Sequence, residues 1–596
     1  MNRQDLLGLL RAGQRPEHNM VMTLDLSDAD LSDLDLNEVK FVDCQLNNVN
    51  FSNVSLDQAA FINCSLLSCN FSAARLQGAM FTNQRLDVDL TADDPMAEPP
   101  PVPMQNCQFT DAELQNVMFA ICDLQGSDFS TATLQQVVFE KSICLSAIFT
   151  DSKQDTVFYD QCELSQADFS AASLLSCTFE KSVISRIVLT DTQIDKCEFV
   201  EVTPQQIDFT GAKLSNINLT KMDLRSASKL AGNYDSCVLA KCDFAGMDLS
   251  GCSFVNADMT ETRLQNCNLS GADCSGALFS EAVLQGANFK GAKLSEANFD
   301  EVTAAQTDFS DAVLDNASFN SADLSQSLFN QAQCKGVSFE GANLADSSLV
   351  QALLEDVSFN NADLSQSDLS SSALSGATFN EAKLTGTKFC QAAGIGVNLS
   401  AALLVKEESV DFAQIQFTAS NFSGLDLSRY DLHSCDFSDG NFADCILDQA
   451  RFDGANISRC DFGKASLQSA ALRNVEAVAV NFMQANLTGA VLTGGNFATA
   501  CFIETKLAIC DFSQAIIDET MITDAECSGA KFCKVSGQYA DFSGSRLINA
   551  DFSGANMLGM NQHSIQDNGA KWQGTNLKDV RKTDKDLAAA QTWQAS

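Results

Sequence analysis

Histidine, tryptophan, tyrosine and proline are scarce in this sequence. Its 596 residues include only 3 His, 2 Trp, 4 Tyr and 7 Pro. It has no apolar run long enough to cross a bilayer, so we expect no transmembrane helix. The opening stretch, MNRQDLLGLLRAGQ, is too short and too interrupted in its apolar part for a signal peptide. These absences predict a cytoplasmic protein with no membrane contact.

Motifs for catalysis and for ligand binding are missing as well. There is no phosphate-binding loop of the GxxxxGK(S/T) type and no paired Cys-x-x-Cys zinc spacing. The histidines, His18, His433 and His563, share no recurring arrangement with carboxylates or thiols, and His433 is expected to point outward because it follows a core position. We therefore predict no enzyme, no catalytic residue, no cofactor and no metal site.

Positive charge is scarce. Lys and Arg total 37 against 77 Asp and Glu, which gives a formal net charge of −40 at pH 7. Phosphate groups are bound mainly by Lys and Arg, so direct nucleic-acid binding is disfavoured.

What the sequence does have is a strict five-residue period. Large apolar residues recur at every fifth position in three blocks of 13, 60 and 34 units, namely Leu26 to Leu86, Phe109 to Leu404 and Phe412 to Leu577. Of the 41 Phe residues, all but Phe158 occupy these central positions. Five fits neither the 3.6 of a helix nor the 2 of a strand, so the repeat itself must define the fold.

Each unit has a small residue two positions before its centre and polar residues in the other slots. Two inward residues in five can share one interior only if the chain turns a corner once per unit. Four such units, one on each side, close a square coil. Units such as Ala-Asn-Phe-Lys-Gly (287–291), Ala-Asp-Leu-Ser-Gln (322–326) and Ala-Asp-Phe-Ser-Gly (540–544) show the pattern.

These units resemble the pentapeptide-repeat family, whose motif is A(D/N)LXX. The resemblance spans roughly residues 24 to 580 and implies an all-β solenoid, a right-handed quadrilateral β-helix, with a role based on interaction rather than catalysis. About 27 coils at about 4.8 Å each predict a rod of roughly 130 Å, with short helical caps at both ends. Because two units are half a coil, Phe should line two opposite faces where it alternates with Leu, as in the expected core residues Phe279, Leu284, Phe289, Leu294 and Phe299.

Cysteine is abundant, at 23, but its positions favour packing over metal or disulfide chemistry. Sixteen cysteines fall in the small inward slot, four are centres, and only Cys390, Cys501 and Cys533 lie elsewhere. A buried free Cys behaves as a small apolar residue, and reduced thiols fit the cytoplasm.

Breaks in the period divide the chain. Off-pattern centres such as Gln154 suggest local kinks or thin spots in the core. The predicted segments are an N-terminal helical cap (1–20), coils (21–86), a proline-rich insert (87–108), coils (109–404), a register break (405–411), coils (412–580) and a C-terminal helical cap (581–596).

The first helix should end at Gly13, and the second should begin with a capping box at Thr583. Leu587 and Trp593 of the second helix are candidates either to close the last coil or to join a second copy. The chain is accordingly predicted to be a monomer or a homodimer formed through this cap.

The insert carries five of the seven prolines between residues 87 and 105, and proline lacks the N–H that a stacked strand donates. We expect this stretch to leave the coil, either as a tolerated surface insertion or as a binding loop. The candidate partner-binding residues are Asp93, Asp94, Glu98, Pro99 and Pro101.

Two functions remain open. The stretch TLDLSDADLSDLDL (23–36), after a short helix, resembles pentapeptide segments associated with bacterial type VI secretion effectors, which implies a scaffold or adaptor whose partner is an effector or a spike component. The alternative is DNA mimicry, because the resemblance includes short family members that bind DNA gyrase, and the partner would then be a topoisomerase or another DNA-binding protein. Forty charges over the predicted rod give about one per 3.3 Å, about half the density of B-DNA. The same charge is also explained by solubility alone.

Overall fold

The computed structural model describes residues 2–83, 99–225, 227, 232–405, 410–586 and 590. The chain forms two compact units, Met1–Leu284 (unit 1) and Gln285–Ser596 (unit 2). In each unit the backbone pairs in parallel with the residue four repeats further along, as in the bridges Asp30↔Asn50 and Ser318↔Ser338. The predicted coil of four repeats is therefore confirmed.

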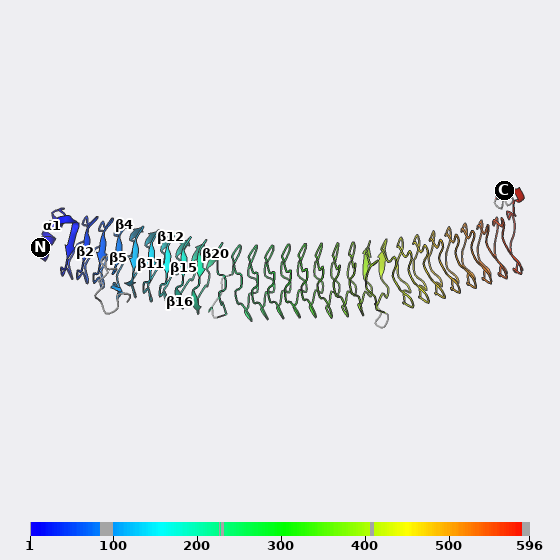
Figure 1. Cartoon of the computed structure of the whole chain (residues 1–596), viewed down its shortest axis with the longest axis horizontal. Helices are drawn as coiled ribbons and strands as arrows, with labels where there is room; N and C mark the ends of the chain where they lie inside the picture. The colour runs from blue at the N-terminus through cyan, green and yellow to red at the C-terminus, as the bar shows by residue number, and fades with distance from the viewer. Residues whose placement is uncertain are drawn as a thin grey trace, which may run out of the picture. The chain divides into compact units, whose positions relative to one another are not determined.

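Unit 1 begins with helix α1 (Arg3–Arg11) and a 3-10 turn, η1 (Glu17–Asn19) (Figure 1). The Asn2 side chain caps the start of α1, and the helix ends at Arg11 with Ala12 as its C-cap. Gly13 follows with a φ of 69°, the left-handed conformation that commonly closes a helix. Leu6 and Leu10 are buried. The predicted N-terminal helix is present, and Gly13 lies two residues beyond its last residue.

The named strands of unit 1 are short and stack coil upon coil (Figure 1). A nine-stranded sheet runs in the order β1 (Met20–Met22), β2 (Lys40–Val42), β3 (Ala60–Ile62), β5 (Met80–Thr82), β8 (Met118–Ala120), β11 (Val138–Glu140), β13 (Phe158–Asp160), β15 (Thr178–Glu180) and β18 (Glu198–Val200). A seven-stranded sheet contains β4 (Arg75–Gln77), β7 (Glu113–Gln115), β10 (Thr133–Gln135), β12 (Lys153–Asp155), β14 (Ser173–Leu175), β17 (Gln193–Asp195) and β20 (Lys213–Ser215).

Three two-stranded ladders complete the named strands. They are β6 (Val102–Pro103) with β9 (Cys122–Asp123), β16 (Val183–Ser185) with β19 (Thr203–Gln205), and, in unit 2, β21 (Ala393–Ile395) with β22 (Gln416–Thr418). Elsewhere the same parallel pairing continues as isolated bridges, one residue per side of the coil.

Each corner is a tight turn that the polar residues of the repeat stabilise. In the first complete repeat the Ala29 N–H donates to the Leu26 carbonyl at 3.0 Å, and Asp28 between them has a φ of 59°. The Asp25 carboxylate accepts from the Ser27 N–H at 2.9 Å, which satisfies a donor that the turn leaves unpaired. Since the third turn residue has a positive φ, Gly, Asn and Asp suit this slot.

The core of unit 1 contains two phenylalanine stacks that meet edge to face. Phe41, Phe61 and Phe81 stack at 5.1 and 4.7 Å between ring centroids, and Phe51 stacks on Phe71 at 4.8 Å. Rings two repeats apart, such as Phe51 and Phe61, meet at 5.9 Å with an interplanar angle of 81°. These geometries are the favourable ones for aromatic pairs. The prediction that Phe lines two opposite faces is confirmed.

Unit 2 repeats this arrangement. Phe299 stacks on Phe319 at 4.7 Å and meets Phe289 edge to face at 5.9 Å. The predicted core residues of both units are fully buried, at 0% exposure: Phe279, Leu284, Phe289, Leu294 and Phe299.

The first break ends earlier than predicted. Met80 pairs with Met118, nearly two coil lengths further along instead of one, so the insert enters between neighbouring coils. The coil resumes at Val102, not after residue 108, because Val102 and Met104 are fully buried. Pro103 is compatible with this strand because its carbonyl accepts from the Leu66 N–H at 2.7 Å. The predicted end of the insert is therefore wrong, and its predicted start, with Leu86 in the core, lies outside the described residues.

The second break has the predicted size. Lys388 pairs with Asp411, three positions beyond the regular step, so three extra residues separate the centres on either side. Phe389 and Phe412 still stack, at 5.6 Å.

At the C-terminal end, Trp572 stacks on Phe552 at 4.3 Å. Asp584, not Thr583, caps the helical residues that begin at Lys585, since its carboxylate accepts from the Asp586 N–H at 2.9 Å. The N-cap thus lies one residue later than predicted, and the Thr583 hydroxyl accepts from the Ser564 N–H at 3.0 Å instead of capping the helix. Leu587 and Trp593 lie outside the described residues.

Candidate interaction surface

The outward carboxylates of the coils serve the fold as well as the surface. Asp30 accepts from the Ser32 hydroxyl at 2.7 Å, from the Ser32 N–H at 3.2 Å and from Asn50 Nδ2 at 3.0 Å. The bonds from Ser32 lower the pKa of Asp30 below its ordinary value, so the carboxylate stays ionised at neutral pH. Part of the negative charge is thus a consequence of how the repeat closes its corners.

Cations are placed against many of these carboxylates one coil away. Lys383 lies 3.2 Å from Asp363, and Arg459 lies 2.6 Å from Asp439. Exposed pairs of this kind contribute at most about 1 kcal/mol each to stability. These Lys and Arg side chains interrupt the negatively charged surface, so the negative charge is not continuous along the coils.

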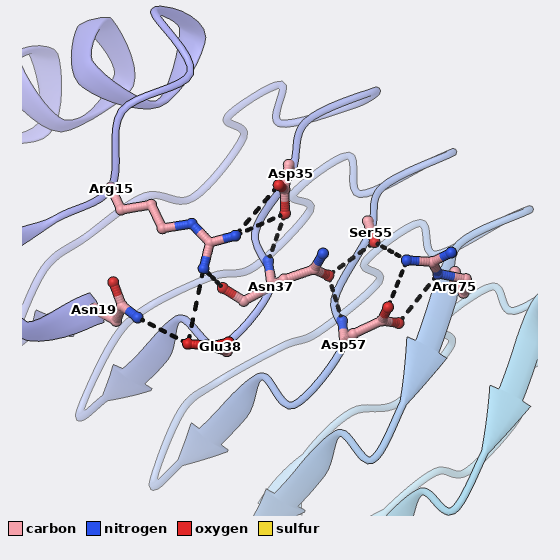
Figure 2. A network of polar contacts seen from close by, with 8 residues as sticks. All are labelled: Arg15, Asn19, Asp35, Asn37, Glu38, Ser55, Asp57 and Arg75. Carbon is pink, nitrogen blue, oxygen red and sulfur yellow. Dashed lines mark hydrogen bonds and ion pairs between the residues drawn. The ribbon is translucent and has the colours of Figure 1, made fainter.

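A polar network ties the N-terminal segment to the first coils (Figure 2). Arg15, which follows α1, donates to the Asn37 carbonyl at 2.7 Å and to both oxygens of Asp35 at 3.3 Å. The Asn37 side chain accepts from the Asp57 N–H at 2.7 Å, and Asp57 forms an ion pair with Arg75 (Figure 2). This network fixes the cap to the coils. The sequence pattern did not point to Arg15, because an isolated Arg gives no periodic signal.

One outward face of unit 1 is apolar over several coils. Residues on both sides of each central position in the nine-stranded sheet point outward, since strand side chains alternate. Met20 and Met22 are 37% and 53% exposed, and Phe158 is 43% exposed. From Met20 to Phe158 the ladder runs through Ala60, which is only 6% exposed, and through the partly exposed Met80, Met118 and Val138, interrupted by Lys40. We call this ladder of outward side chains from Met20 to Phe158 the apolar ladder.

The sequence held one signal for the apolar ladder. Phe158 is the only Phe off the central positions. An exposed aromatic residue in an otherwise strict pattern is informative, because packing in the core cannot explain it.

The predicted loop residues divide between described and undescribed parts of the chain. Pro99 and Pro101 are partly buried beside the start of β6. The Pro100 carbonyl between them accepts a hydrogen bond from the Asn83 side chain, across the two ends of the insert. Asp93, Asp94 and Glu98 lie outside the described residues.

None of the 23 cysteines forms a disulfide, and nineteen of them are buried. Cys390, Cys501 and Cys533, which the repeat placed off the inward positions, are partly exposed, together with Cys252. Burial raises the pKa of the Cys435 thiol to about 11, which keeps it protonated.

Metal-binding groups are not clustered. Over the described part of the chain, no three His, Cys, Asp or Glu side chains are grouped so as to hold a metal ion. His433 points outward as predicted, with its Nδ1 2.8 Å from Asp431.

The stacked coils, turning one corner every five positions, define a four-sided β-solenoid. The chain belongs to the pentapeptide-repeat family, in which this repeat forms a right-handed quadrilateral β-helix. Two family descriptions match, together over more than half of the chain. "Pentapeptide repeats (8 copies)" matches residues 25–61, 50–83, 235–266, 257–295, 292–331, 411–449, 435–474, 465–502, 481–518 and 525–559. "Pentapeptide repeat region" matches residues 152–228 and 312–389.

Solved structures of the same repeat include a trypsin-treated variant of QnrB1, described as a plasmid-mediated fluoroquinolone resistance protein. It is 21% identical over 37% of this chain and 92% of its own, with a TM-score of 0.18. HetL, described as involved in heterocyst differentiation regulation in the cyanobacterium Nostoc sp. strain PCC 7120, is 18% identical over 60% of this chain and 93% of its own, with a TM-score of 0.10. The search of curated proteins found no match.

Among the helices of the described residues, none combines the length and the apolar character needed to cross a bilayer.

Proposed function

We propose that this protein is a non-catalytic scaffold that binds another protein through the outward faces of its coils. The observation that carries the proposal is the apolar ladder, whose end residues Met20 and Phe158 are 37% and 43% exposed. Apolar side chains held outward by a fixed backbone are typical of protein-binding surfaces. The proposal includes a cytoplasmic location, supported by 23 free thiols.

The more specific form of this proposal is an adaptor for a type VI secretion effector or spike component. It rests on the resemblance of residues 23–36. Those residues lie in the first coils, beside the network of Arg15 and Asp35 that fixes the N-terminal cap (Figure 2).

The second candidate is an acidic DNA mimic that binds a topoisomerase or another DNA-binding protein. The net charge of −40 favours it. We rank it below the scaffold, because many carboxylates accept hydrogen bonds within their own turns or face a Lys or Arg one coil away, as Asp363 faces Lys383.

One capture experiment tests both candidates. The tagged protein is incubated with a lysate of its native host at about 0.1 M and about 0.5 M salt, with and without duplex DNA, because salt in this range screens exposed charges strongly and apolar contacts little. Retained proteins are identified by mass spectrometry. The Phe158→Asp variant tests the apolar ladder, and Leu175→Asp, at a 39% exposed position on β14 in the other large sheet of unit 1, is the matched control.

A partner that survives high salt and is lost with Phe158→Asp, but not with Leu175→Asp, supports the scaffold. A partner that is lost at high salt and displaced by duplex DNA supports mimicry. If neither substitution changes what is retained and DNA displaces nothing, both candidates are contradicted.

A further inference from the structure

Strand β1 is the first strand of the nine-stranded sheet, so among the described strands only β2 pairs with it. In a parallel ladder, alternate residues of a strand form hydrogen bonds to opposite neighbours. Strand β3 shows which residues bond to the preceding coil. The Ala60 N–H donates to the Val39 carbonyl at 3.1 Å, and the Ile62 carbonyl accepts from the preceding coil at 3.0 Å. The first and third residues of each strand in this sheet therefore face the preceding coil.

By this pattern, the backbone groups of Met20 and Met22 point away from β2. The Met20 N–H is already used, because it donates to the Glu17 carbonyl. The Met20 carbonyl and both backbone groups of Met22 have no hydrogen-bond partner among the described residues. Unpaired groups of this kind at a sheet edge are a template for pairing with another chain.

Other sides of the first coil are closed by the N-terminal segment. In the second coil, the Asn47 carbonyl accepts a backbone N–H of the first coil at 2.9 Å. Its counterpart in the first coil, the Ser27 carbonyl, accepts instead from the Arg3 side chain at 2.7 Å. Arg15 donates to the Asn37 carbonyl in the same way, also at 2.7 Å. Arginine side chains thus replace the missing coil at these points, whereas none of the described residues does so at β1.

A pocket of about 450 Å³ lies against β1 and is lined by Glu17, His18, Met20, Val21, Met22 and Leu24. Met22 is 53% exposed, and Met20 and Leu24 are partly exposed, so a ligand can reach these side chains. Val21 is buried and points into the coil. The lining contains no residue of α1, which is described over its whole length, so the helix leaves this edge open.

We propose that β1 accepts an extended segment of a partner protein as one more parallel strand. The central residue of the segment donates its N–H to the Met20 carbonyl and accepts from the Met22 N–H. The residue two positions further on donates to the Met22 carbonyl. Since strand side chains alternate, the two neighbours of the central residue point outward beside Met20 and Met22. Apolar residues at these two positions would extend the apolar ladder by one strand.

Two features favour a different protein over a second copy as the occupant. The net charge of −40 drives copies of this chain apart. The edge is also continuous with the apolar ladder, which begins at Met20, so one partner can contact both the face and the edge of the sheet. The inference rests on the proposed scaffold function and specifies how a partner is held at β1.

The test is selection of random peptides displayed on phage against the full-length protein, followed by N-methylation of a selected peptide at one residue at a time. Methylation removes an N–H donor. At the two residues that donate to the Met20 and Met22 carbonyls, it should weaken binding about tenfold, or about 1.4 kcal/mol. At the residue between them, whose N–H points away from β1, it should change binding little. This alternation distinguishes an added strand from a peptide held by its side chains alone.

The Met22→Pro variant removes the one N–H that β1 offers to the segment and should weaken peptide binding about tenfold or more. The fold already accepts proline at such a position, since Pro103 in β6 lacks an N–H while its carbonyl accepts from the preceding coil at 2.7 Å. Met22→Leu is the matched control, because it keeps both the N–H and an outward apolar side chain. If Met22→Pro lowers the melting temperature, the N-methyl series on the unaltered protein decides the question.

Equal effects of N-methylation at successive residues, or equal peptide binding by a stably folded Met22→Pro and by Met22→Leu, would overturn the inference. A selection without apolar residues at alternate positions would do the same. So would a dimer in analytical ultracentrifugation that Met22→Pro dissociates, because the occupant would then be a second copy.

Failure here is distinguishable from failure of the scaffold function. Phe158→Asp, at the other end of the apolar ladder, leaves β1 unchanged and should bind the selected peptides with unchanged affinity. If lysate capture retains a partner that depends on Phe158 but no peptide pairs with β1, the scaffold stands and this inference falls.

Discussion

At the scale of single residues, the slot within the repeat decides whether a side chain is core or surface. Phe299 at a centre is fully buried between neighbouring rings, whereas Phe158, one position before a centre, is 43% exposed. Gln154 shows that the rule tolerates an exception. It sits at a centre, is 2% exposed, and accepts from the Tyr159 hydroxyl at 2.9 Å, so a polar side chain is satisfied inside the core.

Phe299→Asp should destabilise the protein by more than about 3 to 5 kcal/mol, the range for truncating a buried Phe, because it also buries an unpaired charge. The urea midpoint and hydrogen exchange of neighbouring coils are the measurements. Phe158→Asp is the matched control and should shift stability by about 0.5 kcal/mol or less. Equal effects of the two substitutions would contradict the inward assignment.

Buried thiols predict a loss of stability in alkali. Burial raises the pKa of Cys435 to about 11 and that of Cys445 to about 12, while an unfolded thiol ionises at about 8.5. Because the pKa is higher in the folded state, each protonated thiol contributes fully to the free energy of unfolding below about pH 8.5. That contribution is lost as the pH rises toward 11 to 12.

The Cys435→Ala variant isolates one such thiol. When the pH is raised from 7.5 to 9.5, the free energy of unfolding measured in urea should fall by about 1 kcal/mol less for this variant than for the parent, because Ala has no proton to release. The slot accepts Ala one coil on, at Ala455. Parallel pH profiles for the two proteins would contradict this prediction.

At the scale of elements, extra residues are accommodated where the chain leaves the coil after one central position and re-enters it before the next. Phe81 and Met104 are consecutive centres in the ladder, although the whole insert lies between them in the sequence. The sequence located the insert by its prolines but misplaced its end, since Pro103 pairs within a strand through its carbonyl.

Deleting residues 84–101 should restore the period, because Thr82, Asn83, Val102 and Pro103 would then separate Phe81 from Met104 by the usual five positions. The melting temperature should stay the same or rise, since loop closure carries an entropic cost. Deleting residues 84–100 instead puts the ladder out of phase by one and should lower the melting temperature, so equal melting of the two variants would contradict the assigned register.

The same deletion tests the loop as a binding site. If Asp93, Asp94 and Glu98 bind a partner, lysate capture by the variant that lacks residues 84–101 should lose that partner. Capture of the same proteins by this variant and by the parent would contradict a binding role for the loop.

At the scale of the whole molecule, stability and solubility have different origins. Each coil contacts mainly its neighbours, so the free energy of folding is close to a sum over coils. The net charge of −40 keeps copies of the protein apart.

Acidification to the isoelectric point, about 4.2, should therefore cause association before unfolding. Hydrogen bonds from Ser32 to Asp30 and from Ser250 to Asp248 lower the pKa of both carboxylates. Because the pKa of these carboxylates is lower in the folded protein than in the unfolded chain, where it is about 3.9, they stabilise the fold at pH above that unfolded pKa. This stabilisation is lost only as the pH falls through the pKa of the folded state. Light scattering should rise near pH 4.2 while far-UV circular dichroism is retained. Loss of circular dichroism at or above the pH of association would contradict this order.

The sequence by itself determined the coil, the inward and outward positions, the phenylalanine stacks and the size of the second break, because a strict five-residue period leaves one way to bury its large residues. The sequence could not show which outward residues form a binding surface, since Asp, Asn and Ser recur on every face to close the turns. Only the tertiary structure aligned Met20, Met22 and Phe158 on one sheet, because residues a whole coil apart become neighbours only when coils stack. It alone also showed that Tyr430, at 7% exposure, is buried in a slot that holds alanine in the next coils.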